Sequence, residues 1–422
     1  FLHLILTMKT LSISVFSLVR LVMILLGISI ISCGPKTDAS LTEEVDYRAY
    51  AIKVADSFLD RNSDFIITYN EDRNKHKWHY EQGLMLSTLH DVYMKTDDSK
   101  YLEFIHNNLD LYVDSLGQIA TYKPNTFKLD DVTPGRALLR MYKETTEERY
   151  ILAAEQIHNQ LLDQPRTNEG GFWHKKIYPS QMWLDGLYMA GPFSAEYAIL
   201  NSQPEEFEDI VNQFVWAYGH LHDATTGLLY HGWDESLQQE WADPETGLSS
   251  SFWSRGMGWY MMALVDVLDI LPEDYARRNV LIKQLQDISL AVLNYRDPST
   301  NLWYQVTDQQ DREGNYLESS ASAMFIYAMS KGANRGWLDP AYGVHAAESF
   351  SSYLQQFVTT DADGLISIHQ TCSSAGLGGK QKRDGSSDYY LSEPIRKNDC
   401  KAIGPFILAA LELDENASRG QQ

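Results

Sequence analysis

Residues 183–200 read WLDGLYMAGPFSAEYAIL, and this stretch decides the class of fold. The spacing of its apolar residues predicts an α-helix. Asp185 falls in the first turn of that helix, where the helix dipole favours a carboxylate. Two interpretations of the stretch stay open: Asp185 carries chemistry, or it only helps to start the helix while Trp183 fills the core.

Helical periodicity recurs on both sides of this stretch, and turns rich in Gly, Pro, Asp and Asn separate the helical windows. The predicted helices cover residues 45–60, 80–94, 100–115, 134–142, 148–162, 183–200, 205–221, 252–268, 274–294, 319–329, 341–356 and 402–413. Two β-prone segments, residues 228–231 and 302–306, lie between helices. We expect both to belong to long functional loops.

These windows make six helix pairs, and no Pro/Gly-rich linker divides them. Helix pairs that are apolar on one face can bury those faces by packing side by side, and six pairs can close into a ring. We therefore predict an all-α fold, an (α/α)6 toroid of six helical hairpins, in a single catalytic domain over residues 43–415. An open helical solenoid would show the same periodicity and stays as the alternative.

The composition excludes several classes of protein. The chain has 422 residues, of which 44% are hydrophobic, enough for a sizeable core. Its 57 acidic residues outnumber 35 basic ones, and the resulting net charge of −22 would repel a nucleic acid. The cysteines, Cys33, Cys372 and Cys400, have neither zinc-site nor redox spacing, so we expect no metal and no cofactor. Whether Cys372 and Cys400 pair stays open.

The first residues have the features of an export signal. A basic start at Lys9 is followed by an apolar run over residues 11–31 and by small residues before Cys33. We predict a signal peptide over residues 1–32 with lipoprotein-type cleavage, lipidation of Cys33, and a linker over residues 33–42. The protein would then be an exported, membrane-anchored lipoprotein, periplasmic or on the cell surface. The alternative is a stop-transfer helix with an incidental cysteine.

Side chains that can carry chemistry gather in a few segments. The candidates are Tyr80, Asp130, His174, Lys175, Trp183, Asp185, His231, Trp253, Arg255 and Trp259. Aromatic residues make up 12% of the chain and suit stacking on sugar rings. Two carboxylates among histidines, cations and aromatic rings predict a pocket for an anionic carbohydrate. For Asp130, which precedes a helix, a capping role is the competing interpretation.

These segments resemble glycoside hydrolase family 105, the unsaturated rhamnogalacturonyl hydrolases. The matching motifs are LD at 129–130, PRT at 165–167, GGFWHK at 170–175, QMWLDGLYM at 181–189, WSRG at 253–256, RDGS at 383–386 and YYLSE at 389–393. The resemblance implies the (α/α)6 toroid. It also implies substrates left by polysaccharide lyases, with a 4,5-unsaturated uronic acid at the non-reducing end. An acid protonates C4, water adds at C5, and the product opens and expels the neighbouring sugar.

The resemblance also implies roles for single residues. Asp185 matches the general acid and base, and Asp130 matches the second carboxylate of the pocket. His174, Lys175, His231 and Arg255 match positions around the uronate, and Tyr80, Trp183, Trp253 and Trp259 match its stacking walls. Because Asp185 lies beside Trp183 and Met182 in the chain, we expect burial to raise its pKa and to keep it protonated.

The identity of the leaving sugar stays open between two candidates, rhamnose of rhamnogalacturonan and sulfated rhamnose of ulvan. A sulfate would need an added cation, for which Lys380, Lys382 and Arg383 are candidates; the competing interpretation is a solvated basic loop. Two further hypotheses are an unsaturated glucuronyl hydrolase acting on glycosaminoglycan disaccharides and a non-catalytic glycan-binding lipoprotein. The sequence does not indicate an oligomeric state.

Overall fold

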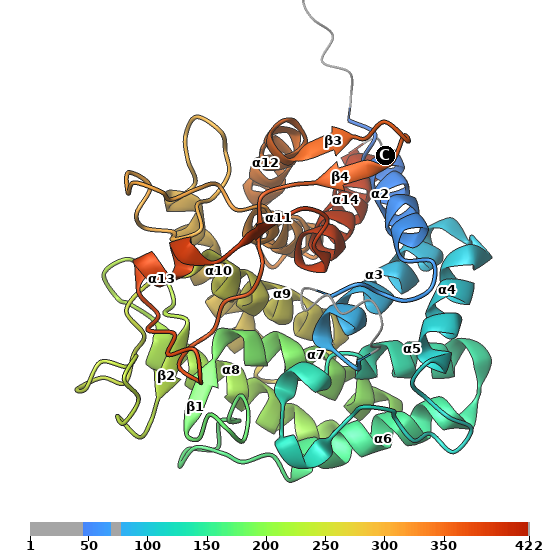
Figure 1. Ribbon diagram of the computed structural model, residues 1–422, viewed down its shortest axis with the longest axis horizontal. Helices are drawn as coiled ribbons and strands as arrows, with labels where there is room; N and C mark the ends of the chain where they lie inside the picture. Colours follow the sequence, from blue (N-terminus) through green and yellow to red (C-terminus); the bar gives the residue numbers. More distant parts are fainter. Residues whose placement is uncertain (1–44, 69–76, 421–422) are drawn as a thin grey trace, which may run out of the picture. The chain divides into compact units, whose positions relative to one another are not determined.

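The computed structural model describes residues 45–68 and 77–420 (Figure 1). The predicted signal peptide, the lipidation site Cys33 and the linker up to residue 42 lie outside the described residues. Within the described part, no helix is both long and apolar enough to cross a membrane.

The described chain is mostly helical. Its long helices are α2 (Tyr47–Arg61), α3 (Tyr80–Thr96), α4 (Ser99–Asp110), α5 (Gly135–Thr145), α6 (Glu148–Leu162), α7 (Leu184–Leu200), α8 (Phe207–Leu221), α9 (Ser254–Ile270), α10 (Arg278–Asn294), α11 (Ser319–Asn334), α12 (Ala341–Phe357) and α14 (Cys400–Gly420). Each overlaps one of the predicted windows. The short α13 (Ser387–Ser392) was not predicted.

Short strands interrupt the helices, which the prediction of an all-α fold did not include. The antiparallel pairs are β1 (Gln181–Trp183) with β2 (Gly232–Asp234), β3 (Val358–Thr360) with β4 (Ile366–Ile368), and β5 (Thr371–Cys372) with β6 (Ile395–Arg396). The 3-10 turns η1 (Pro124–Thr126), η2 (Leu129–Asp131) and η3 (Pro204–Glu206) lie in the loops. Strands of two or three residues are too short for an alternating pattern to predict.

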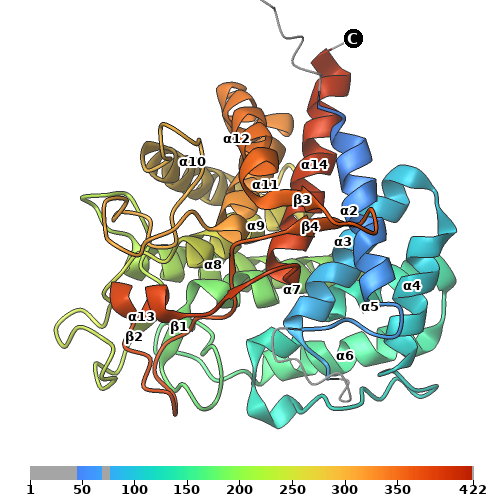
Figure 2. The same cartoon turned by 45° about the horizontal axis from the view of Figure 1, so that its top comes forward.

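The helices contact one another in a repeating order. Along the chain, α3, α5, α7, α9, α11 and α14 each contact the next, and α14 also contacts α3. Five other helices, α4, α6, α8, α10 and α12, each pack against the helix that precedes them. The sixth pair joins distant parts of the chain, because α2 lies alongside α14 (Figures 1 and 2).

Burial separates the two sets of helices. In α9 every residue from 254 to 268 is buried, and in α11 every residue from 319 to 332 is buried. In α4, by contrast, the buried residues form the single stripe Tyr101, Phe104, Ile105, Asn108 and Leu109. The helices α3, α5, α7, α9, α11 and α14 are therefore called the inner helices below.

The inner helices begin where most of the predicted site residues lie. Tyr80 is the first residue of α3, while Asp185 and Arg255 are the second residues of α7 and α9. The edge of Tyr80 meets Trp259 of α9 with ring centroids 6.2 Å apart. The candidate site thus lies at the N-terminal ends of the inner helices.

Candidate active site

The two-stranded pairing of β1 with β2 brings Asp185 to His231. Trp183 pairs with Gly232, and the backbone N–H of Leu184 donates to the carbonyl of His231 at 3.0 Å. As a result, the side chain at the start of α7 meets the imidazole: His231 Nε2 lies 3.0 Å from Asp185 Oδ2. His231 is fully buried, and the Asp185 side chain is 14% exposed.

The other ring nitrogen of His231 also has a partner. Its Nδ1 lies 2.8 Å from the hydroxyl of Tyr390, in α13. Tyr390 is buried and stacks on Trp253 with ring centroids 5.7 Å apart. The sequence alone indicates no role for Tyr390, although the YYLSE motif contains it. Asp185, His231 and Tyr390 therefore form one hydrogen-bonded row.

Asp130 lies in η2 beside two lysines and a histidine. Its carboxylate is 2.8 Å from Lys175 Nζ, 3.4 Å from His174 Nε2 and 3.6 Å from Lys128 Nζ. Burial alone would raise the pKa of Asp130, but Lys175, Lys128 and His174 outweigh it and hold that pKa well below its usual range. Asp130 is therefore ionised at neutral pH. Lys128, which also pairs with Asp131 at 2.8 Å, was missed by the sequence analysis.

The expected pKa of Asp185 is wrong in direction. Burial does raise it, but His231 and then His174 outweigh burial, and the pKa of Asp185 lies below its ordinary value. The local sequence showed the apolar neighbours Trp183 and Met182 and could not show imidazoles from elsewhere in the fold. Without substrate, Asp185 is a carboxylate at neutral pH.

The tryptophans pack against other protein rings. Trp183 stacks on His174 with centroids 4.5 Å apart and on Tyr178 at 4.8 Å. Trp259 packs against Tyr188 at 4.8 Å. Trp253 and Trp259 are each 1% exposed, so they frame the site from within the protein. Their stacking on a sugar stays a prediction, as it does for Tyr80 and Trp183.

Arg255 is fixed beside Trp253. Its Nη1 donates to the carbonyl of Cys372 at 2.5 Å and to Ser320 Oγ at 3.2 Å, and the carboxylate of Glu318 lies 3.8 Å away. The guanidinium carbon is 4.9 Å from the ring of Trp253. The Cys372 and Cys400 thiols are buried and free, which answers the open question of their pairing.

The basic residues of the loop near residue 380 have two different environments. Arg383 donates to the Tyr178 hydroxyl at 2.9 Å and to the carbonyls of Leu377 and Gly378 at 3.0 and 3.1 Å. Its charge thus holds the loop against the ring that stacks on Trp183. Lys380 is exposed, and Lys382 is 80% exposed. The two lysines fit the interpretation of a solvated loop.

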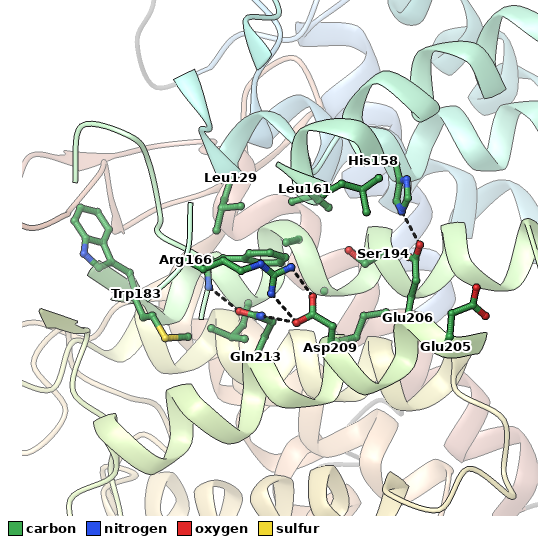
Figure 3. Close-up of a pocket in the computed structure, with 18 residues that line it drawn as sticks. Leu129, His158, Leu161, Arg166, Trp183, Ser194, Glu205, Glu206, Asp209 and Gln213 are labelled. Atoms are coloured by element: carbon green, nitrogen blue, oxygen red, sulfur yellow. Dashed lines mark hydrogen bonds and ion pairs between the residues drawn. The ribbon is translucent and has the colours of Figure 1, made fainter. Parts of the chain in front are cut away.

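A cavity of about 310 Å3 lies between α6, α7 and α8 (Figure 3). Its walls are mainly apolar and include Leu129, Leu161, Phe172, Leu187, Ala190 and Ile210. At its edge, Arg166 of the PRT motif pairs with both oxygens of Asp209 at 2.7 and 2.9 Å. Neither Asp185 nor Asp130 lines this cavity, but Trp183 does, so the cavity adjoins the candidate site.

Comparisons with known proteins point to one group of glycoside hydrolases. The family model described as Glycosyl Hydrolase Family 88 matches residues 50–417. A solved glycoside hydrolase of family 105 from C. acetobutylicum is 43% identical; the match covers 87% of this chain and 99% of that one, with a TM-score of 0.83.

Two curated relatives carry names that describe an activity. The unsaturated rhamnogalacturonyl hydrolase YesR of Bacillus subtilis is 30% identical over 60% of this chain and 70% of its own length. The unsaturated 3S-rhamnoglycuronyl hydrolase of Formosa agariphila is 28% identical over 37% of this chain and 41% of its own length. Taken with the family model and the solved structure, these matches show that the chain belongs to glycoside hydrolase family 105, within the group that the family 88 model covers, and is a glycoside hydrolase of the unsaturated rhamnogalacturonyl hydrolase type.

Proposed function

We propose that the enzyme removes a 4,5-unsaturated uronic acid from the non-reducing end of lyase-generated, rhamnose-containing oligosaccharides by hydrating the C4=C5 bond. The Asp185 O–H bond breaks as the double-bond electrons form the C4–H bond, and positive charge develops at C5 and the ring oxygen. Water then adds at C5 and returns a proton to Asp185. The hemiketal opens and releases the neighbouring sugar.

The observation that carries this proposal is the position of Asp185. Its Oδ2 is engaged by His231 at 3.0 Å, its side chain is mostly buried, and Oδ1 makes no hydrogen bond to another residue in the described part. One carboxylate oxygen is thus fixed and the other is available to a substrate. Such an arrangement suits general acid and base catalysis.

Asp130 suits a different role. Its low pKa and its neighbours Lys175, Lys128 and His174 make it a permanent hydrogen-bond acceptor, so we assign it to the hydroxyls of the unsaturated ring. His174, Lys175, His231 and Arg255 are proposed to surround the uronate. The pKa of His174 is lowered by burial, so it is neutral at pH 7 and can donate a single hydrogen bond there.

For the leaving sugar, we propose unsulfated rhamnose of rhamnogalacturonan. Arg383 already donates hydrogen bonds to Tyr178 and to the loop carbonyls, and Lys382 is mostly exposed. The relative named for rhamnogalacturonyl substrates also matches more of this chain than the one named for 3S-rhamnoglycuronyl substrates. Turnover of matched oligosaccharides with and without the sulfate tests this, and a preference for the sulfated one refutes it.

Substitution of Asp185 tests the reaction. Asp185→Asn keeps the shape and can still accept from His231, so the fold should persist while turnover falls by about 10² to 10⁴. Loss of the absorbance of the unsaturated sugar measures turnover, and wild-type turnover by the variant would refute the assignment. In heavy water, the mechanism predicts deuterium at C4 of the product. Its absence would indicate ordinary glycoside hydrolysis instead.

We also propose that the six helix pairs close as an (α/α)6 toroid. The support is the cycle of contacts among the inner helices, in which α14 contacts both α11 and α3. Export and lipid anchoring through Cys33 are proposed from the sequence alone. A radiolabelled fatty acid should label the wild-type protein in cells and should not label Cys33→Ser; equal labelling would refute the anchor.

A further inference from the structure

Both ring nitrogens of His231 are engaged, by residues distant in the chain. Nε2 faces Asp185 Oδ2 at 3.0 Å, and Nδ1 faces the Tyr390 hydroxyl at 2.8 Å. The imidazole is fully buried and contacts Trp253 with ring centroids 4.6 Å apart. A buried imidazole whose two nitrogens have fixed partners has its proton position set by those partners.

Tyr390 is fixed as firmly as His231. Its carbonyl accepts from Gln305 Nε2 at 3.1 Å, and its ring lies nearly parallel to that of Trp253, at an angle of 10°. The start of α13 is capped by Ser386, whose hydroxyl oxygen accepts from the N–H of Tyr389 at 3.1 Å. The hydroxyl of Tyr390 is therefore held where it meets Nδ1.

The direction of these hydrogen bonds follows from the tyrosine. Burial raises the pKa of Tyr390 well above its usual value, so its hydroxyl keeps its proton. In the described part of the chain, His231 Nδ1 is the only hydrogen-bond partner of that hydroxyl. The O–H therefore donates to Nδ1, which must be unprotonated. In neutral His231 the remaining proton is then on Nε2, which donates to Asp185 Oδ2.

We propose that Tyr390 is a positioning residue that holds His231 in its Nε2–H tautomer, and so leaves Oδ1 of Asp185 as the atom that exchanges a proton with the substrate. The inference rests on the proposed function, because it concerns the same acid. In the other tautomer, a nitrogen lone pair would face Oδ2. The catalytic proton would then be drawn to Oδ2, on the side turned to His231.

Other charged and titratable groups surround this row. His174 faces Asp185 from the loop before β1, and Arg255 of α9 lies against Trp253, which contacts His231. Tyr389, Arg383 and Asp384 face Tyr390. None of these groups replaces the donor at Nδ1, since Tyr390 is the hydrogen-bond partner there among the described residues.

Tyr390→Phe tests the inference, and Tyr389→Phe is the matched control. Both variants lose one hydroxyl from α13, but the Tyr389 hydroxyl accepts from the N–H of Gly376 at 3.1 Å. In Tyr390→Phe, Nδ1 can take the proton, Asp185 then loses its donor, and its pKa rises. The descending limb of the kcat profile should move to higher pH by about one unit, a tenfold change in the acid dissociation constant.

A merely structural role for Tyr390 would lower kcat without moving that limb. An unmoved limb, a shift to lower pH, or an equal shift in Tyr389→Phe would therefore overturn the inference. The change in kcat should exceed the change in KM, since Tyr390 acts through His231 on the acid Asp185.

A second measurement separates this inference from the proposed function. Nitrogen-15 NMR of the unliganded enzyme with labelled histidine, with His231→Gln to assign the signal, reports the tautomer without any turnover. We expect the Nε2–H form in the wild type and Tyr389→Phe, and a mixture in Tyr390→Phe. An Nδ1–H wild type, or an unchanged tautomer in Tyr390→Phe, refutes the inference. A wild type that fails to hydrate unsaturated uronides refutes the proposed function alone.

Discussion

Arg136 is the centre of a buried ion cluster between α5, α7 and α9, and its removal should be costly. Its Nη1 lies 2.8 Å from Asp266, while Nε and Nη2 lie 3.0 and 2.9 Å from one oxygen of Glu196. The exposed fractions of these three side chains are between 4% and 8%. Arg136→Met keeps most of the side-chain length and removes the charge and every donor.

The expected loss is about 3 kcal/mol in the free energy of unfolding at pH 7. Removing one partner from a buried ion pair typically costs 3–5 kcal/mol, because a charge is left uncompensated. The lower end applies here because other cations remain: Arg140 lies 3.3 Å from Glu196, and Lys331 lies 3.2 Å from Asp266.

The loss should also depend on pH. In the wild type, burial raises the pKa values of Glu196 and Asp266, but Arg136 and the other cations outweigh burial and hold both below their ordinary values. These carboxylates therefore stabilise the fold above the ordinary carboxyl pKa, and that stability is lost as the pH falls towards their lowered values. In Arg136→Met both pKa values rise, so mild acid neutralises the stranded charges. The difference between variant and wild type should shrink from pH 7 to about pH 4.

Urea unfolding followed by tryptophan fluorescence at both pH values measures this difference. A loss below about 1 kcal/mol at pH 7, or one that grows in acid, would refute the argument from uncompensated charge. The double variant Arg136→Met/Glu196→Gln should recover part of the stability, because it removes one of the stranded carboxylates. Turnover per folded molecule should be unchanged, since Arg136 contacts neither Asp185 nor Asp130.

Three further predictions concern the site and its frame. Lys175→Met removes the nearest cation of Asp130, at 2.8 Å, so the pKa of Asp130 should rise. The ascending limb of the kcat/KM profile should then move to higher pH, and an unmoved limb contradicts this. In Gly83→Ala, the added Cβ would lie 2.4 Å from the backbone nitrogen of Pro134, so we expect a loss of about 1–3 kcal/mol by calorimetry, and an unchanged Tm contradicts the contact. Ser194→Val adds apolar volume to the cavity of Figure 3 and should raise stability by about 0.5–2 kcal/mol with unchanged kcat; a lower Tm would show that the cavity cannot hold the extra methyl group.

The helices could be predicted because their signal is local. The periodicity of residues 148–162 gives the bounds of α6 as the structure has them. α11, in contrast, continues to Asn334, five residues beyond its predicted end. Lys331 lies in that extension, and its polar head pairs with Asp266 at 3.2 Å. Local sequence cannot show that a lysine near a helix end has a buried carboxylate as its partner.

The site could be predicted only as far as its motifs reach. The sequence singles out Asp185 and His231, but their contact depends on β1 pairing with β2, which is a long-range event. Tyr390 is one of 25 tyrosines, and although it lies in the YYLSE motif, the sequence does not show that its hydroxyl meets His231 in the fold. Lys128 was not predicted for the same reason, because its role depends on its distances to Asp130 and Asp131.

An enzyme with a net charge of −22 must still bind an anionic sugar, and the side chains supply less positive charge than the sequence implies. Lys175 is paired with Asp130, Arg255 lies near Glu318, and burial lowers the pKa of His174. The inner helices add a second source of positive charge, because each helix N-terminus carries about half a positive charge, and no change of pH removes it.

The N-terminus of α7 also affects the protonation of Asp185. The start of α7 and the imidazole of His231 both favour the carboxylate form of Asp185, which is the wrong form for giving a proton to C4. Under the proposed function, the bound uronate brings a like charge and excludes water, and both effects raise the pKa of Asp185. Asp185 would then be protonated only when the correct anionic ring is bound. A neutral methyl ester of the substrate should therefore lose kcat as well as affinity, and a loss confined to KM would contradict this coupling.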